Sequence, residues 1–170
     1  MSSKDQNLSA GTKQKHKSVE DFTFAIIVSD WNEEITYSLR DACIESLKEN
    51  GAKEENILIH HVPGAFELPI GATLVMGQEK VDAVICLGCV IKGETNHDIY
   101  INHAIAYGIM NISLVSKKPV IFGVLTPNTY EQAIDRAGGT YGNKGVEAAI
   151  SAIKMVHMAN PENGKKSIGF

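Results

Sequence analysis

Val81-Asp82-Ala83-Val84-Ile85-Cys86-Leu87 is an apolar run of the length and composition of a buried β-strand. It continues into Gly88-Cys89-Val90-Ile91-Lys92-Gly93-Glu94-Thr95-Asn96-His97-Asp98, and a longer segment with helical apolar periodicity follows. A strand that leads through a turn into a helix is the repeating unit of an open parallel sheet, which binds ligands at the carboxyl ends of its strands. Backbone N–H groups at such a helix start can bind an anion. His97 can transfer protons near neutral pH.

The rest of the chain repeats this alternation. Apolar runs rich in Ile, Val and Phe predict continuous, buried strands over 22–29, 56–62, 82–90 and 119–125. Helical patterns between and after them predict helices over 36–50, from a first turn that contains Pro69, and over 96–116, 133–137 and 143–158. This order predicts an α/β fold with a four-stranded parallel sheet flanked by helices on both faces.

Length and composition indicate one soluble domain. The chain has 170 residues, 44% of them hydrophobic, and a net charge of -4. We expect a flexible segment over 1–18, a domain over 19–158 and a tail over 159–170. The charge and the scattered basic residues argue against a nucleic-acid partner or a membrane surface. No apolar run is long enough to span a bilayer, and no secretory signal opens the chain.

Cysteine usage favours a reducing compartment, and we therefore expect a cytoplasmic protein. The three cysteines, Cys43, Cys86 and Cys89, are an odd and small number. Cys86 and Cys89 have the spacing of a redox pair, but they lie in or at the end of a predicted strand rather than at a helix start. We expect buried, inert thiols, no metal site and no cofactor.

Polar and aromatic residues gather where the predicted strands end. Trp31, in Ser29-Asp30-Trp31-Asn32, can stack on a flat ring or pack against a helix. Glu67, in Pro63-Gly64-Ala65-Phe66-Glu67, can complement a helix dipole or accept hydrogen bonds from a polyol. His97, one turn into the third helix, can be structural or can act beside an anion-binding turn formed by Gly93, Glu94 and Thr95.

Two cations follow the last strand. Arg136 is predicted at the end of one helix, where it can interact with the helix dipole. Lys144 is predicted at the start of the next helix, where the dipole disfavours a cation, so its position calls for a functional explanation. Both can bind an anionic or carbonyl-bearing ligand.

Together these loops resemble one family. Ser-Asp-Trp-Asn, Pro-Gly-Ala-Phe-Glu, Gly-Cys-Val-Ile-Lys-Gly-Glu-Thr-Asn-His, Phe-Gly-Val-Leu-Thr and Asp-Arg-Ala-Gly-Gly-Thr-Tyr-Gly-Asn-Lys-Gly occur in the order and spacing of lumazine synthases, from about Phe22 to Met158. The resemblance implies a flavodoxin-like three-layer sandwich. It implies a transferase that condenses 5-amino-6-(D-ribitylamino)uracil with 3,4-dihydroxy-2-butanone 4-phosphate. The products are 6,7-dimethyl-8-ribityllumazine, phosphate and water, in the penultimate step of riboflavin biosynthesis.

The resemblance also assigns roles. His97 would be the general acid and base. Trp31, where the family usually has Phe, would stack on the pyrimidine ring. Phosphate would be bound by Gly93, Glu94, Thr95 and Arg136, with Glu94 turned outward because its carboxylate would repel the anion. The family often has an acidic residue two positions after the histidine, but Ile99 stands there in this chain. The remaining substrate-binding residues would be Asn32, Ala65, Phe66, Glu67, Val90, Ile91, Phe122 and Lys144.

Finally, the resemblance implies a homo-oligomer with the site between neighbouring subunits of a pentamer. Phe122, Arg136 and Lys144 would come from the neighbour. The compact turn over 138–144 has the length seen in members that form a 60-subunit icosahedral shell, so it favours a shell, with riboflavin synthase as a candidate partner. The alternatives are a non-catalytic protein of the same fold that binds a flavin or a lumazine or forms a shell, and a flavodoxin-like electron carrier. His97 together with Arg136 argues against the first, and a loop over 29–32 that is poor in Ser and Thr argues against the second.

Overall fold

The fold is built around a parallel sheet in the computed structural model, which describes residues 17–161. The strands are β1 (Phe24–Ser29), β2 (Ile57–Val62), β3 (Ala83–Cys89) and β4 (Val120–Leu125). Their order is β2-β1-β3-β4, and every neighbouring pair is parallel. The predicted α/β fold with a four-stranded parallel sheet is therefore confirmed.

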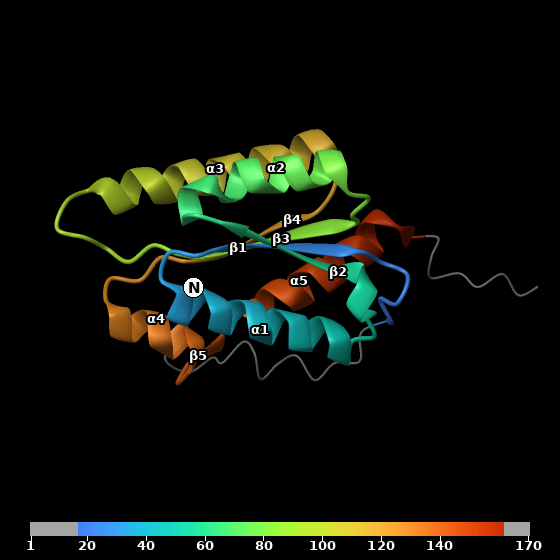
Figure 1. Ribbon diagram of the computed structural model, residues 1–170, viewed down its shortest axis with the longest axis horizontal. Coiled ribbons are helices and arrows are strands. Elements are labelled where there is room, and N and C mark those ends of the chain that lie inside the picture. The colour runs from blue at the N-terminus through green and yellow to red at the C-terminus, as the bar shows by residue number, and fades with distance from the viewer. Residues whose placement is uncertain (1–16, 162–170) are drawn as a thin grey trace, which may run out of the picture.

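Helices cover both faces of the sheet, which makes three layers (Figure 1). On one face lie α2 (Leu68–Gln78) and α3 (His97–Ser116), and on the other lie α1 (Glu33–Glu49), α4 (Tyr130–Arg136) and α5 (Lys144–Ala159). Two short 3-10 turns, η2 (Glu54–Asn56) and η3 (Ala65–Glu67), precede β2 and α2. The sheet is thus shielded from water on both faces, as continuous apolar strands require.

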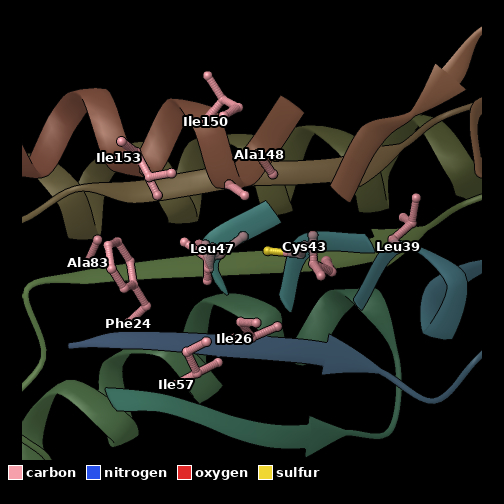
Figure 2. Close-up of a cluster of buried hydrophobic side chains, with 14 of the residues drawn as sticks. Phe24, Ile26, Leu39, Cys43, Leu47, Ile57, Ala83, Ala148, Ile150 and Ile153 are labelled. Carbon is pink, nitrogen blue, oxygen red and sulfur yellow. The ribbon is translucent and has the colours of Figure 1, made fainter. Parts of the chain in front are cut away.

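The core consists of two layers separated by the sheet. Successive side chains of β1 alternate between them, so that Phe24 and Ile26 face α1 and α5 while Ala25 and Ile27 face α2 and α3. Figure 2 shows the first layer, where Leu39, Cys43 and Leu47 of α1 pack with alanines and isoleucines of α5. This packing fixes α5, the helix that follows the last loop of the predicted site.

The two edge strands, β2 and β4, depart from the continuous burial that the sequence predicted, β4 only at Ile121 and Phe122. β1 and β3 are buried throughout, whereas β2 alternates between buried and more exposed residues. Ile59 is exposed because β2 is an edge strand, with β1 as its neighbour on one side only among the described residues.

Helix starts differ from the predictions by a few residues. α1 begins at Glu33 rather than at residue 36, because Asn32 takes a left-handed conformation (φ 61°) and ends the preceding loop. α3 begins at His97, so His97 is the first helical residue and the prediction that it lies one turn into the helix is wrong. Thr129 caps α4 by accepting a hydrogen bond from the Gln132 N–H at 3.3 Å, while Gln132 Oε1 accepts one from the Asn128 N–H at 2.9 Å.

The segment after α4 forms a small antiparallel hairpin that the sequence did not predict. It consists of β5 (Ala137–Gly139) and β6 (Gly142–Asn143). Gly138 and Gly142 have φ values of 112° and 82°, which only glycine adopts readily. The hairpin sets the separation of Arg136, at the end of α4, from Lys144, at the start of α5.

The predicted ends of the domain are described only in part. The predictions for 1–18 and 159–170 fall largely on 1–16 and 162–170, which lie outside the described residues. Val19 is fully buried, and its N–H donates to the Asn50 carbonyl at 3.2 Å. Within 17–161, none of the helices has the length and apolarity needed to cross a membrane.

Candidate functional site

The loops that follow β1, β2 and β3 line one open cleft of about 410 Å³ at the carboxyl edge of the sheet. Three separate segments of the chain meet there, as the parallel topology predicts. Besides Gly64, Cys89, Asp98 and Ile101, the lining contains ten of the predicted site residues: Trp31, Asn32, Ala65, Phe66, Glu67, Val90, Ile91, Gly93, Thr95 and His97.

The first loop is tied to its neighbours by backbone bonds. The N–H groups of Asp30 and Trp31 donate to the carbonyls of Val62 (2.8 Å) and Pro63 (3.1 Å). The Asn32 side-chain amide donates to the Cys89 carbonyl at 3.1 Å. The Trp31 side chain is 72% exposed and lines the cleft, so it does not pack into a helix. Its ring is therefore available for a planar ligand.

A polar cluster supports this loop from the side. Asp30 Oδ1 accepts hydrogen bonds from His61 Nδ1 (2.7 Å) and from the Tyr37 hydroxyl (2.9 Å). The bonds to His61 and then to Tyr37 hold the pKa of Asp30 below its usual value, and the same carboxylate raises the pKa of Tyr37. The Arg40 guanidinium lies 4.4 Å from the centre of the Tyr37 ring. The cluster fixes the residue that precedes Trp31.

The second loop forms one wall of the cleft. η3 continues directly into α2, and Pro69 occupies the first turn of α2, where its missing N–H costs nothing. Gly88 at the end of β3 allows close packing, because a Cβ there would lie 2.9 Å from Leu68 Cδ1. Phe66 is 55% exposed and faces the cleft together with Glu67. An aromatic ring and a carboxylate thus stand side by side on this wall.

The third loop runs beside the end of β4 before α3 begins. Val90 and Lys92 donate their N–H groups to the carbonyls of Leu125 (2.9 Å) and Pro127 (3.0 Å). Glu94 is exposed and is not among the residues that line the cleft, unlike Gly93 and Thr95.

Arg136 and Lys144 lie in a second cavity, also of about 410 Å³, formed by the end of β4, α4, the hairpin and the start of α5. Arg136 Nη1 donates to the Tyr141 carbonyl at 2.6 Å, and Nη2 donates to Glu147 Oε1 at 2.6 Å. Lys144 Nζ donates to Glu147 Oε2 at 3.1 Å. Within the described chain, the cavity that Arg136 and Lys144 line is thus distinct from the cleft that His97 lines.

Two residues bear on the predictions in other ways. Phe122 lines neither cavity and is half-buried in β4, against the core layer under α2 and α3.

Glu147 was not predicted from the sequence. Its spacing of three residues from Lys144 on one helix was a usable signal, because residues three apart are neighbours on a helix surface.

The cysteines are buried in the core. All three are free thiols, and burial raises the pKa of Cys86 and of Cys89 to about 12 and raises that of Cys43 further. Thiols in this state are poor nucleophiles, which agrees with the predicted inert role. Within 17–161, no group of three or more His, Cys, Asp or Glu side chains is placed to hold a metal ion.

Comparison with known proteins gives one consistent result. The family model for 6,7-dimethyl-8-ribityllumazine synthase matches residues 21–160. The chain is 50% identical over 156 residues to a protein of that name from Cytophaga hutchinsonii, a match that covers 92% of this chain and 98% of the relative. It is 51% identical over 133 residues to one from Bacteroides fragilis, covering 78% and 93%. A third, from Flavobacterium psychrophilum, is 44% identical over 163 residues, covering 96% and 86%.

Proposed function

Because this chain belongs to the 6,7-dimethyl-8-ribityllumazine synthase family, we propose that its two cavities form the halves of a lumazine synthase active site. The enzyme condenses 5-amino-6-(D-ribitylamino)uracil with 3,4-dihydroxy-2-butanone 4-phosphate and releases 6,7-dimethyl-8-ribityllumazine, phosphate and water. The observation that carries the proposal is the cleft in which three loops place an exposed indole, a carboxylate and a histidine.

The cleft suits the aminouracil. A pyrimidine ring can stack on the exposed face of Trp31, with Val90 and Ile91 as apolar contacts on the opposite loop. Glu67 and the backbone of Ala65 and Phe66 stand where a ribityl chain would need hydrogen-bond partners, and Asn32 ties this loop to β3. Hydrogen-bond partners of this kind favour ligands with matching hydroxyl groups.

The reaction needs little covalent chemistry from the protein. The amine of the aminouracil attacks the ketone and an imine forms with loss of water. Phosphate is then eliminated, and ring closure with loss of a second water completes the product. Holding two molecules in one orientation supplies much of such a rate. We propose that His97, which lines the cleft, moves protons between the amine, the carbonyl oxygen and water. We propose that the backbone N–H groups around Gly93 and Thr95, in the loop that precedes α3, bind the phosphate.

The phosphate also needs cations, and these lie in the second cavity. We propose that Arg136 and Lys144 of one subunit, with Phe122, complete the cleft of its neighbour. A heterologous contact forms a ring when the rotation between successive subunits closes, and a pentamer is the ring that the family resemblance implies. We also propose that such pentamers assemble further into a 60-subunit shell, with riboflavin synthase as a partner.

The surface of α3 supports an oligomer. Between Ile99 and Ser116 the helix contains no Asp, Glu, Lys or Arg. Several of its large side chains are mostly exposed in the single chain: Tyr100, Tyr107, Met110, Leu114 and Val115. An apolar surface of this extent is typical of subunit interfaces. We also propose a cytoplasmic location, in keeping with three free, buried thiols.

The proposed activity is tested by mixing the purified protein with both substrates. Lumazine fluorescence and phosphate release are followed together, against a control without enzyme, because the condensation also proceeds slowly unaided. We expect acceleration of both signals in equal amounts. Assembled protein that accelerates neither would favour the non-catalytic binding or shell protein.

A further inference from the structure

Glu147 connects the two cations of the second cavity. Its Oε1 accepts a bond from Arg136 Nη2 at 2.6 Å, and its Oε2 accepts one from Lys144 Nζ at 3.1 Å. Each carboxylate oxygen is thus engaged by a different cation. The three residues come from two helices, since Arg136 ends α4 while Lys144 and Glu147 lie in the first turn of α5.

These contacts are more sheltered than an ordinary surface ion pair. The side chains of Glu147, Arg136 and Lys144 are 10%, 15% and 28% exposed. Solvent and salt screen such pairs less than exposed ones, and charge-assisted hydrogen bonds are stronger than neutral ones. Arg136 is also held through Nη1 by the Tyr141 carbonyl at 2.6 Å. Two bonds therefore fix the plane of the guanidinium, whose other N–H donors remain for a ligand.

The arrangement also sets the charge of the cavity. Two cations share one carboxylate, which leaves a net charge of about +1 on the cluster. A phosphate ester or inorganic phosphate would therefore bind to oriented N–H donors, at a cluster in which the carboxylate already neutralises one of the two positive charges. Arginine and lysine side chains are long and lose considerable rotamer entropy when they are held. The carboxylate orients both before the ligand arrives, which is the condition for pre-organised binding.

We propose that Glu147 is a positioning residue for phosphate recognition, which holds Arg136 and Lys144 in the orientation that binds the phosphate ester and the phosphate product. This inference rests on the proposed function, because it takes the second cavity to be the phosphate side of the site. Glu147 itself touches neither substrate in this account, since both of its oxygens are occupied by the cations.

Two substitutions of Glu147 separate its orienting hydrogen bond to Arg136 from its negative charge. Glu147→Gln retains an oxygen that can accept from Arg136, whereas Glu147→Ala removes both contacts. We expect Glu147→Ala to raise the KM for the phosphorylated ketone and the inhibition constant of inorganic phosphate about tenfold, the effect of the phosphate losing one charge-assisted contact when the cations are no longer held. Glu147→Gln should restore most of this loss. The KM for the aminouracil should stay unchanged in both variants.

The matched control is Glu45→Ala on α1, an exposed glutamate outside both cavities, which should change none of these constants. An unchanged KM for the phosphorylated ketone in assembled Glu147→Ala protein overturns the inference. Equal increases of the KM in the Gln and Ala variants also overturn the inference. They would show that the negative charge of Glu147 matters, and not the hydrogen bond that orients Arg136.

Binding of inorganic phosphate, measured by calorimetry on the assembled variants, separates this inference from the proposed function. If the wild-type protein forms no lumazine but Glu147→Ala still weakens phosphate binding, the proposed function fails and the role of Glu147 stands. If Arg136→Ala leaves phosphate binding unchanged, the phosphate role of the cavity fails and the inference fails with it.

Discussion

Gly145 is the glycine at which one added methyl group should destabilise the fold most. It is the second residue of α5, and a Cβ there would lie 1.9 Å from the Leu39 carbonyl oxygen and 2.7 Å from the Leu39 carbonyl carbon. Both are backbone atoms of α1, so no side-chain rotation relieves the contact. A carbon atom normally approaches a carbonyl oxygen to about 3.3 Å, so the two helices must separate locally by roughly 1.4 Å.

The cost follows from the packing of α1 on α5. Overpacking a core costs about 1–3 kcal/mol, and a clash with backbone places Gly145→Ala at the upper end. The higher helix propensity of alanine offsets less than about 1 kcal/mol of this loss of stability near a helix start. A net loss of about 2–3 kcal/mol should lower the Tm by roughly 4–12 °C for a chain of this size. Because α5 carries Lys144 and Glu147, activity should fall as well.

Thermal unfolding followed by circular dichroism at one fixed subunit concentration measures the effect, since oligomers unfold at a temperature that depends on concentration. Gly77→Ala in α2 is the matched control, because a Cβ there meets nothing within 4 Å. That variant should keep or raise the Tm. A Tm for Gly145→Ala within about 2 °C of the wild type would refute the reasoning.

Three further predictions concern the site and the core. His97→Ala should lower kcat by about 10²–10⁴-fold without changing the size of the assembly in gel filtration, and disassembly would argue against a catalytic role. Arg136→Ala should raise the KM for the phosphorylated ketone about tenfold and leave the KM for the aminouracil unchanged in steady-state assays. Cys43, Cys86 and Cys89 should resist iodoacetamide at about pH 8 in the native protein and react in denaturant, because burial raises their pKa values. Rapid labelling of the native protein would contradict the described burial.

Much of the fold follows from local sequence patterns. Runs such as Val84–Leu87 are apolar throughout because both faces of a central parallel strand are buried, and the turns between strand and helix gather at one edge by topology alone. The convergence of the first three loops could therefore be predicted. The partial exposure of β2 could not be predicted, because it depends on the position of β2 at the edge of the sheet and no local sequence pattern gives the strand order.

The misses have physical reasons as well. The β5–β6 hairpin is only a few residues long and depends on positive φ values at Gly138 and Gly142, so it leaves no apolar periodicity to detect. The contact of Glu147 with Arg136 joins two helices across that hairpin, and only the folded chain brings them together. No local pattern in the sequence indicates that Arg136 and His97 line separate cavities, and only the family resemblance assigned Arg136 to a neighbouring subunit.

The central claim is that one active site is built from the cleft of one subunit and the second cavity of its neighbour. It is tested most directly by co-refolding His97→Ala subunits with Arg136→Ala subunits and measuring lumazine formation. In a ring of mixed subunits, about one interface in four would pair an intact His97 with an intact Arg136. At a concentration of the phosphorylated ketone well below the wild-type KM, Arg136→Ala alone should retain about a tenth of the wild-type activity and His97→Ala far less. The account predicts that the mixed assemblies reach about a quarter of the wild-type value under the same conditions. Activity that stays at the level of the separate variants, in assemblies shown to be mixed, would contradict a site shared between subunits.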